Sequence, residues 1–295
     1  MKASWQTLLA SSTPIIADGG MGTMLFANGL EQGGCPEMWN VDRPDVIASI
    51  HQGYIQAGAQ IILTNSFGGN RVRLESHGHG ERAAELNQAA ARLARTAADA
   101  APNPVVVGGS MGPTGQMMAP LGDLTAEEAT AIFAEQAAAL VASGVDVLWI
   151  ETMSDLAEVQ AARAGCRQAA PATPVVATMT FDTKGRTMMG VKPEQAVSAF
   201  QEFDLVALGA NCGNGPDEIE SIIKHMHAAN PDVVLVAKAN AGLPHMESGR
   251  PVYDATPDDM AAYSRRVHQL GATIIGACCG STPDHIRAIA GALAP

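Results

Sequence analysis

The feature that most constrains the fold is an alternation, repeated along the sequence, of short β-branched apolar runs with longer Ala-rich stretches. The short runs predict buried strands, and the Ala-rich stretches predict the helices that connect parallel strands. The expected strands are Pro14–Ala17, Gln60–Thr64, Val105–Gly108, Val145–Ile150, Val175–Met179, Leu205–Ala210, Val233–Ala237 and Thr273–Gly276. The expected helices are Arg43–Ala57, Glu81–Ala100, Thr125–Ser143, Asp155–Gln168, Pro193–Glu202, Pro216–Ala229, Thr256–Leu270 and Pro283–Ala292. This α/β pattern predicts a closed (β/α)8 barrel, the TIM barrel.

An open, doubly wound sheet is the competing architecture. It would normally carry a Gly-rich dinucleotide loop after its first strand, with an acidic residue about 20 positions later. Here that loop is Asp18-Gly19-Gly20-Met21-Gly22, and its leading carboxylate would repel a pyrophosphate. The length of 295 residues suits one barrel of about 250 residues with its connections. We therefore expect a single domain over residues 1–295.

The charge of the chain excludes several classes of partner. A formal net charge of -12 disfavours nucleic acid and anionic membrane surfaces, since both attract basic patches. No apolar run approaches the ~20 residues that span a bilayer, and the N-terminus does not resemble a secretory signal.

The five cysteines, an odd number, argue against a disulfide scaffold and favour metal or thiol chemistry in a reducing compartment. We expect a cytoplasmic protein that acts on a small molecule.

Three cysteines follow two of the expected strands. Cys212 ends the sixth strand region, and Cys278 with Cys279 ends the eighth, so only one strand of a barrel separates them. Chemistry in such barrels sits at the carboxyl ends of the strands, and three thiolates with an open fourth position suit a catalytic zinc ion. Gly280 supplies the backbone freedom that lets adjacent cysteines face one ion. The alternatives are three ordinary buried cysteines, as we expect for Cys35 and Cys166, or a strained disulfide between Cys278 and Cys279.

A zinc ion held by three thiolates would accept a fourth soft ligand, and a substrate thiol is the natural candidate. Binding lowers the pKa of such a thiol from ~8.5, and the thiolate is the nucleophilic form. Two carboxylates, Asp18 and Glu151, end the first and fourth strands and need a cationic partner in an apolar barrel mouth. A substrate ammonium group would be one. Alternatively, Asp18 is a turn residue before Gly19, and Glu151 starts a helix.

These residues lie in motifs that resemble the homocysteine S-methyltransferase family, which includes betaine–homocysteine methyltransferase and the homocysteine-binding module of cobalamin-dependent methionine synthase. The resemblance runs from Asp18 to Ile286. The motifs are Asp18-Gly19-Gly20-Met21-Gly22-Thr23, Thr64-Asn65-Ser66-Phe67-Gly68, Gly112-Pro113-Thr114, Glu151-Thr152, Gly209-Ala210-Asn211-Cys212, Asn240-Ala241-Gly242-Leu243-Pro244 and Gly276-Ala277-Cys278-Cys279-Gly280-Ser281-Thr282-Pro283.

The resemblance implies methyl transfer to homocysteine to form methionine. In this interpretation Cys212, Cys278 and Cys279 hold zinc, and Asp18 and Glu151 take the amino group of homocysteine. The backbone around Gly19, Gly20, Thr64 and Asn65 would face its carboxylate.

The methyl donor is left open by the sequence. The betaine-using branch carries tyrosines where this chain has Gly68 and Thr152, although Trp39, Phe67 or Phe181 could offer a cation–π face. The motifs at Glu151 and Asn240 look closer to the methionine synthase module, whose donor is a methyl-corrinoid on another domain. The donor is thus betaine or a methyl-corrinoid. The alternative function is a homocysteine-activating subunit that is inert without a corrinoid protein partner.

A third possibility is aldolase-like chemistry beside a structural zinc. It needs a Schiff-base lysine at a strand end, and Lys238, expected just after the seventh strand, is the candidate. A phosphate site in the loop after the eighth strand is not expected, because Thr282 and Pro283 suit the N-cap and first turn of a helix and Asp284 would repel phosphate. The expected oligomeric state is a monomer or small homo-oligomer.

Overall fold

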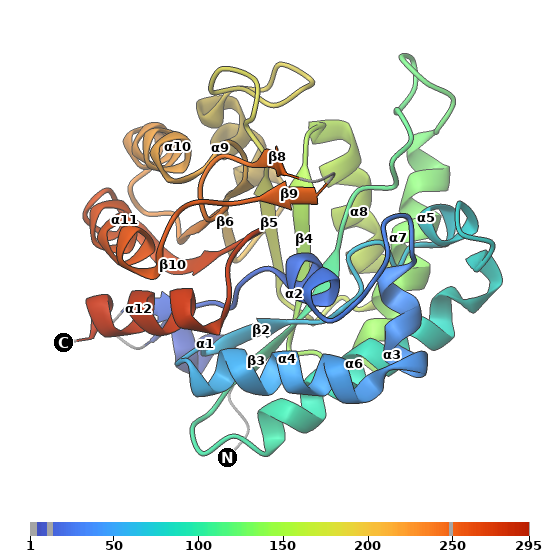
Figure 1. Ribbon diagram of the computed structural model, residues 1–295. Helices are drawn as coiled ribbons and strands as arrows, with labels where there is room; N and C mark the ends of the chain where they lie inside the picture. Colours follow the sequence, from blue (N-terminus) through green and yellow to red (C-terminus); the bar gives the residue numbers. More distant parts are fainter. Residues whose placement is uncertain (1–4, 11–13, 248–249, 295) are drawn as a thin grey trace.

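The computed structural model describes residues 5–10, 14–247 and 250–294 and confirms the barrel (Figure 1). One parallel eight-stranded sheet has the order β1-β10-β7-β6-β5-β4-β3-β2. Its closing edges meet, since Asp18 N donates to Ile61 O at 3.0 Å and Gln60 N to Ile16 O at 2.7 Å. The strands are β1 (Ile15–Ile16), β2 (Ile61–Leu63), β3 (Val106–Met111), β4 (Val147–Met153), β5 (Val175–Met179), β6 (Ala207–Cys212), β7 (Leu235–Ala239) and β10 (Ala272–Ala277).

Helices surround the sheet, and all eight that the sequence predicts are present, with ends that differ by at most two residues. Side chains of the expected kind cap several of these helices. Thr125 and Thr256 form capping boxes, and Asp155 caps the helix that begins at Leu156. The eight are α4 (Pro44–Gln56), α6 (Ala83–Asp99), α7 (Ala126–Ala142), α8 (Leu156–Ala169), α9 (Pro193–Glu202), α10 (Pro216–Ala229), α11 (Pro257–Gln269) and α12 (Pro283–Leu293).

Shorter helical segments precede or interrupt the connections, and the sequence does not predict them. They are α1 (Trp5–Leu9), α2 (Met21–Ala27), α3 (Trp39–Asp42), α5 (Arg71–Glu75) and the 3-10 turns Pro36–Met38 and Gly80–Arg82. In the described part of the chain, no helix combines the length and the apolar character that crossing a bilayer requires.

The apolar core has two layers. Alternate strand residues fill the barrel interior, among them Val147 and Trp149 of β4 and Val236 of β7. The intervening residues pack outward against the helices, as period-2 side-chain alternation requires. Trp5 of α1 packs edge-on against Trp149, with ring centroids 6.5 Å apart. The interior is therefore a packed core, and free space for a ligand lies at the strand ends.

One addition to the barrel was not predicted. The connection from β7 to α11 contains a small antiparallel hairpin of β8 (His245–Glu247) and β9 (Arg250–Val252) (Figure 1). All three residues of β8 are exposed, and so is Leu243 just before it. A strand such as β8, with every residue exposed, lacks the hydrophobic alternation by which strands are recognised in a sequence.

Candidate active site

The three cysteines expected at the strand ends come together. Cys212 is the last residue of β6, and Cys278 and Cys279 directly follow β10. Their sulfur atoms all lie within 4.8 Å of one another, and Cys212 Sγ lies 2.7 Å from Cys278 Sγ. All three side chains are partly exposed, whereas Cys35 and Cys166 are buried elsewhere. The predicted convergence on one rim of the barrel is confirmed.

Unusual backbone conformations turn these cysteines toward one another. Cys212 has φ 60°, in the left-handed region that few non-glycine residues occupy, and Gly213 follows with φ 68°. Gly280, after the cysteine pair, has φ 81°, as the sequence led us to expect. The strand pleat is thus broken directly at the sulfur atoms, which allows two adjacent cysteines to share a site.

Asn240 joins the two halves of the cluster. Its side-chain Nδ2 donates to Gly213 O at 2.7 Å, next to Cys212, and its Oδ1 accepts from Cys279 N at 3.0 Å. One side chain after β7 therefore bridges the ends of β6 and β10 on either side of it. The sequence placed Asn240 at a strand end without giving it this role.

Asn211, the residue before Cys212 in β6, links this strand to β4. Its Oδ1 accepts from Thr152 N at 2.9 Å and its Nδ2 donates to Thr152 Oγ1 at 2.7 Å. Thr152 has φ 61°, which is strained for a β-branched residue. These paired bonds hold the strained backbone at Thr152, near the end of β4, against the strand that carries Cys212.

The cluster fits a tetrahedral thiolate-binding metal ion. Zinc–sulfur bonds of ~2.3 Å place sulfur atoms about 3.8 Å apart, a separation that side chains within the observed 4.8 Å reach by small movements. Hydrogen bonds from Cys212 and Cys278 lower the pKa of Cys279 well below its ordinary value. The same sulfur contacts raise the pKa of Cys212 well above its ordinary value. The three thiols are thus electrostatically linked, and soft sulfur donors of this kind select zinc over hard cations.

A buried ion pair lies beside the cysteines. Lys238 Nζ donates to Asp18 Oδ1 at 2.6 Å, and Leu63 N donates to Asp18 Oδ2 at 2.7 Å. Burial raises the pKa of Asp18, and the Lys238 ammonium group acts against that rise. Asp18 lies just after β1, and its carboxylate bonds to β2 and β7 rather than to the backbone of the following turn, so it is not the turn cap considered above. Sequence reasoning missed this pair, because it placed Lys238 after the strand, whereas the residue lies within β7.

Glu151 is the second carboxylate of this region. It lies in β4, five residues before α8 begins, so it does not start a helix. Ser110 Oγ of β3 donates to Glu151 Oε1. Burial raises the pKa of Glu151 to about 7, and the charge of Lys238 works against the rise. At neutral pH this carboxyl group is therefore close to its midpoint, where a cationic ligand would drive it to the ionised form.

The backbone groups expected to face a substrate carboxylate differ in availability. Gly20 N already donates to Ser281 Oγ at 2.9 Å, and Thr64 N donates to Gly108 O at 2.9 Å. Among the described residues, no acceptor is seen for Gly19 N or Asn65 N. Of the four residues, these two keep an amide group for a ligand.

The three aromatic residues that the sequence offered, Trp39, Phe67 and Phe181, do not assemble a cage for a quaternary ammonium group. Phe181 is fully buried. Trp39 already stacks with Arg43, whose guanidinium carbon lies 5.1 Å from the ring centroid. Phe67 is partly exposed and stands as a single ring. The loop after β10 behaves as predicted, with Thr282 as N-cap and Pro283 in the first turn of α12.

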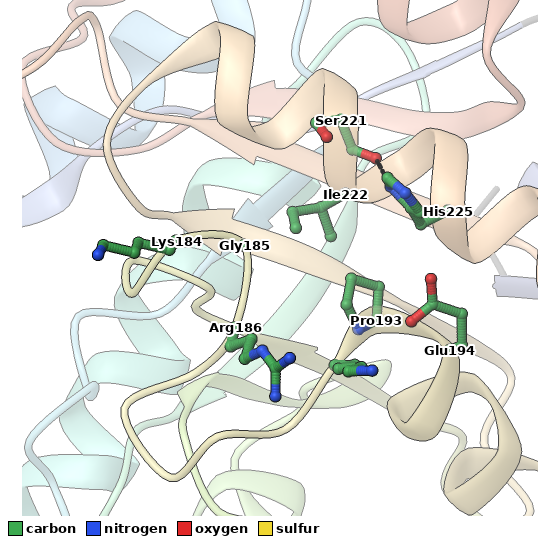
Figure 2. Close-up of a pocket in the computed structure, with 9 residues that line it drawn as sticks. Lys184, Gly185, Arg186, Pro193, Glu194, Ser221, Ile222 and His225 are labelled. Atoms are coloured by element: carbon green, nitrogen blue, oxygen red, sulfur yellow. Dashed lines mark hydrogen bonds between the residues drawn. The ribbon is translucent and has the colours of Figure 1, made fainter.

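The basic side chains around one outer cavity form no second centre. A cavity of about 340 Å³ lies between the β5–α9 connection and α10, away from the cysteines. Figure 2 shows Lys184 and Arg186 extending in different directions around it, with the carboxylate of Glu194 on its far side. The charges do not converge, so the cavity offers no defined anion site.

Comparisons with known proteins agree with this geometry. The family model described as homocysteine S-methyltransferase matches residues 15–293. The methionine synthases of Mycobacterium tuberculosis and Mycobacterium leprae are both 34% identical to this chain, over 96% and 95% of its length. The chain spans only 25% and 24% of those relatives. The metallated form of the homocysteine methyltransferase MmuM from Escherichia coli superposes with a TM-score of 0.81 at 25% identity, covering 97% of this chain and 98% of that one.

Proposed function

Because the chain belongs to the homocysteine S-methyltransferase family, we propose that it transfers a methyl group to the sulfur of homocysteine and forms methionine. The observation that carries this proposal is the group of three cysteines at the ends of β6 and β10. Residues 1–295 would act as one homocysteine-binding domain, and a reducing compartment such as the cytoplasm would keep the thiols available.

We propose Cys212, Cys278 and Cys279 as the ligands of one zinc ion. When bound, the ion would lower the pKa of the homocysteine thiol and so supply a thiolate at neutral pH. The protein's own part is to hold the three sulfur atoms on one side, through Asn240 and the left-handed backbone at Cys212. The partly exposed fourth side is left for the substrate.

The amino-acid end of homocysteine would lie against the carboxylates beside the cysteines. Glu151 is suited to its ammonium group, because a cationic ligand offsets the burial that raises the pKa of this carboxyl group. Asp18 borders the same space but already holds Lys238. The amide groups of Gly19 and Asn65 would receive the substrate carboxylate, with Gly20 and Thr64 completing the adjacent backbone.

For the methyl donor we propose a corrinoid carried by a partner protein. The aromatic cage that a quaternary ammonium donor needs is not assembled among Trp39, Phe67 and Phe181. Moreover, the exposed large apolar side chains of the described chain all follow strands β1, β3, β5 and β7, at the end of the barrel that carries the cysteines. They are Phe26, Met117, Leu121, Met188, Leu243 and Met246. Apolar and methionine-rich surfaces of this kind suit a docking macromolecule.

A donor assay tests the proposal. The zinc-loaded protein is incubated with homocysteine and, in separate reactions, with betaine, a sulfonium donor, free methylcobalamin or a methyl-corrinoid protein. Methionine is then quantified. We expect product only from the corrinoid donors, and faster from the protein-bound one. Turnover with betaine or the sulfonium alone would reject the proposed donor but keep the function. Absence of product from every donor, together with no homocysteine binding, would reject the function.

A further inference from the structure

We infer that Lys238 is a specificity-determining positioning residue: its ammonium group is the permanent counter-ion of Asp18, which leaves Glu151 as the single carboxylate that receives the amino group of homocysteine. This assignment depends on the proposed function, since it names the residue that recognises part of the proposed substrate. It also separates two carboxylates that the sequence treated as equivalent.

The contacts of Asp18 show that it is already satisfied. One carboxylate oxygen accepts from Lys238 Nζ at 2.6 Å and the other from Leu63 N at 2.7 Å. Both side chains of the pair are only 3% exposed. A substrate ammonium group that replaced Lys238 at Asp18 would have to leave the lysine charge buried and unpaired, which is strongly unfavourable.

The barrel interior is built to hold Lys238 in place. The residue belongs to a central strand, in register with Asn211 on one side and Gly276 on the other. Gly276 adds no side chain, and a methyl group there would lie 2.7 Å from Asp18 O. The lysine nitrogen lies 6.0 Å from the centre of the Trp149 ring, which belongs to the interior cluster. The cation is therefore enclosed in the barrel, with its side chain only 3% exposed.

Glu151 has a different environment. Its one hydrogen bond from a described side chain comes from Ser110 to Oε1, and it is 9% exposed where Asp18 is 2% exposed. The charged and titratable groups that face it are Lys238 of β7, Asp18 of β1 and Cys278 after β10. Two of these three are acidic groups, so a further cation beside Glu151 is favoured.

The balance of charge in the site explains why a buried lysine is needed there. Zinc with three thiolates carries a formal charge of -1, and Asp18 and Glu151 would bring the buried total to -3 without a resident cation. Lys238 cancels Asp18, and the substrate ammonium group then cancels Glu151. The site is thus matched to a ligand with one amino group, and its selectivity for the amine should depend on Glu151.

The test compares homocysteine with 4-mercaptobutanoate, which lacks the amino group but keeps the thiol and carboxylate. Dissociation constants are measured by calorimetry on zinc-loaded protein. We expect Glu151→Gln to weaken homocysteine binding by about thirtyfold or more and 4-mercaptobutanoate binding by less than about threefold. Asp18→Asn should change both ligands by the same factor, because Asp18 does not contact the amino group.

Replacing Lys238 should make the binding of homocysteine depend on Asp18. In a Lys238→Met background Asp18 becomes free to pair with the substrate, so a further Asp18→Asn change should weaken homocysteine selectively. Such a gain cannot arise from a general loss of structure. Lys224→Met, on the exposed face of α10, is the matched control and should leave the selectivity as in the parent protein. The combined Asp18→Asn and Lys238→Met variant removes both charges of the pair and covers the case in which a single variant fails to fold.

The outcomes separate this inference from the proposed function. If Asp18→Asn weakened homocysteine selectively in the protein that retains Lys238, by a factor similar to that of Glu151→Gln, the inference would be overturned while the function stood. Equal selectivity in the Lys238→Met protein before and after the Asp18→Asn change would overturn it as well. If zinc-loaded protein bound neither thiol, the proposed function would fall, and this inference with it.

Discussion

At the scale of single residues, the burial of Glu151 makes the stability of the protein depend on pH. Its folded-state pKa of about 7 lies above the ordinary value of 4.5, so the folded protein binds more protons than the unfolded chain between these values. Stability contributed by this group is therefore present at low pH and is lost as pH rises toward 7 and beyond. Above pH 7 the charged carboxylate is kept in an environment that disfavours it.

We predict that Glu151→Gln, which removes the titration, gains stability relative to the parent protein as pH rises. The difference in free energy of unfolding between the two metal-free proteins should grow by roughly 2 kcal/mol from pH 5 to pH 8. Denaturant unfolding under reducing conditions measures it. The exposed Glu127→Gln variant controls for loss of a surface carboxylate. A difference that shrank with rising pH would show that the sign is wrong.

The cysteines offer a second prediction at this scale. Cys212→Ala removes one of three sulfur donors, and we expect it to reduce bound zinc from one ion per chain to nearly none after dialysis. Cys166→Ala removes a fully buried thiol of α8 and should keep the metal. Atomic absorption on both variants gives the comparison. Full zinc content in the Cys212→Ala protein would contradict the ligand assignment.

At the scale of the elements, Asn240 ties together strands that are not neighbours. We predict that Asn240→Ala lowers zinc affinity by about 10–100-fold, the usual cost of removing a group that orients metal ligands. The physical reason is the loss of both bonds that hold the backbone beside Cys212 and Cys279. A competition titration with a chelator measures the affinity.

Asn70→Ala is the matched control, because Asn70 is also a buried asparagine in a strand-to-helix connection. It caps α5 by accepting from Arg73 N and contacts none of the cysteines. This variant should lose stability but keep its zinc affinity. Equal affinities in the two variants would mean that Asn240 does not organise the cluster.

The elements also show what a sequence can and cannot predict. The barrel and the bounds of its main helices were predictable because local signals, such as Thr125, Asp155 and Thr256 at helix starts, agree with the hydrophobic pattern. The convergence of Cys212 with Cys278 followed from strand order alone. The β8–β9 hairpin was not predictable, since the residues of β8 are all exposed and show no hydrophobic alternation.

The partner of Asp18 was missed for a related reason. Lys238 lies 220 positions away along the chain, and a lysine in an apolar strand is ordinarily read as the strand's end. Only the three-dimensional arrangement shows it enclosed in the barrel with its counter-ion. Long-range side-chain pairing of this kind leaves no local pattern in a single sequence.

At the scale of the whole molecule, the exposed apolar residues around the barrel mouth lead to a prediction about the partner. We expect Met188→Glu combined with Leu243→Glu to slow methyl transfer from a corrinoid protein at least tenfold, because charge replaces apolar contact at the proposed docking surface. Transfer from free methylcobalamin should change little, which serves as the internal control. Equal effects on both donors would locate the defect in the site and not at the surface.

The position of β10 in the sheet has a consequence for how the active protein comes into being. This strand is the last of the eight along the chain, yet it lies between β1 and β7 and pairs with both. A chain emerging during synthesis can therefore assemble seven strands and still have an open seam and a single sulfur donor, Cys212. Insertion of β10 closes the seam and delivers Cys278 and Cys279 in the same event. If these cysteines hold zinc as proposed, the chain would bind the metal tightly only after the last strand has closed the barrel, so metal binding would report complete folding.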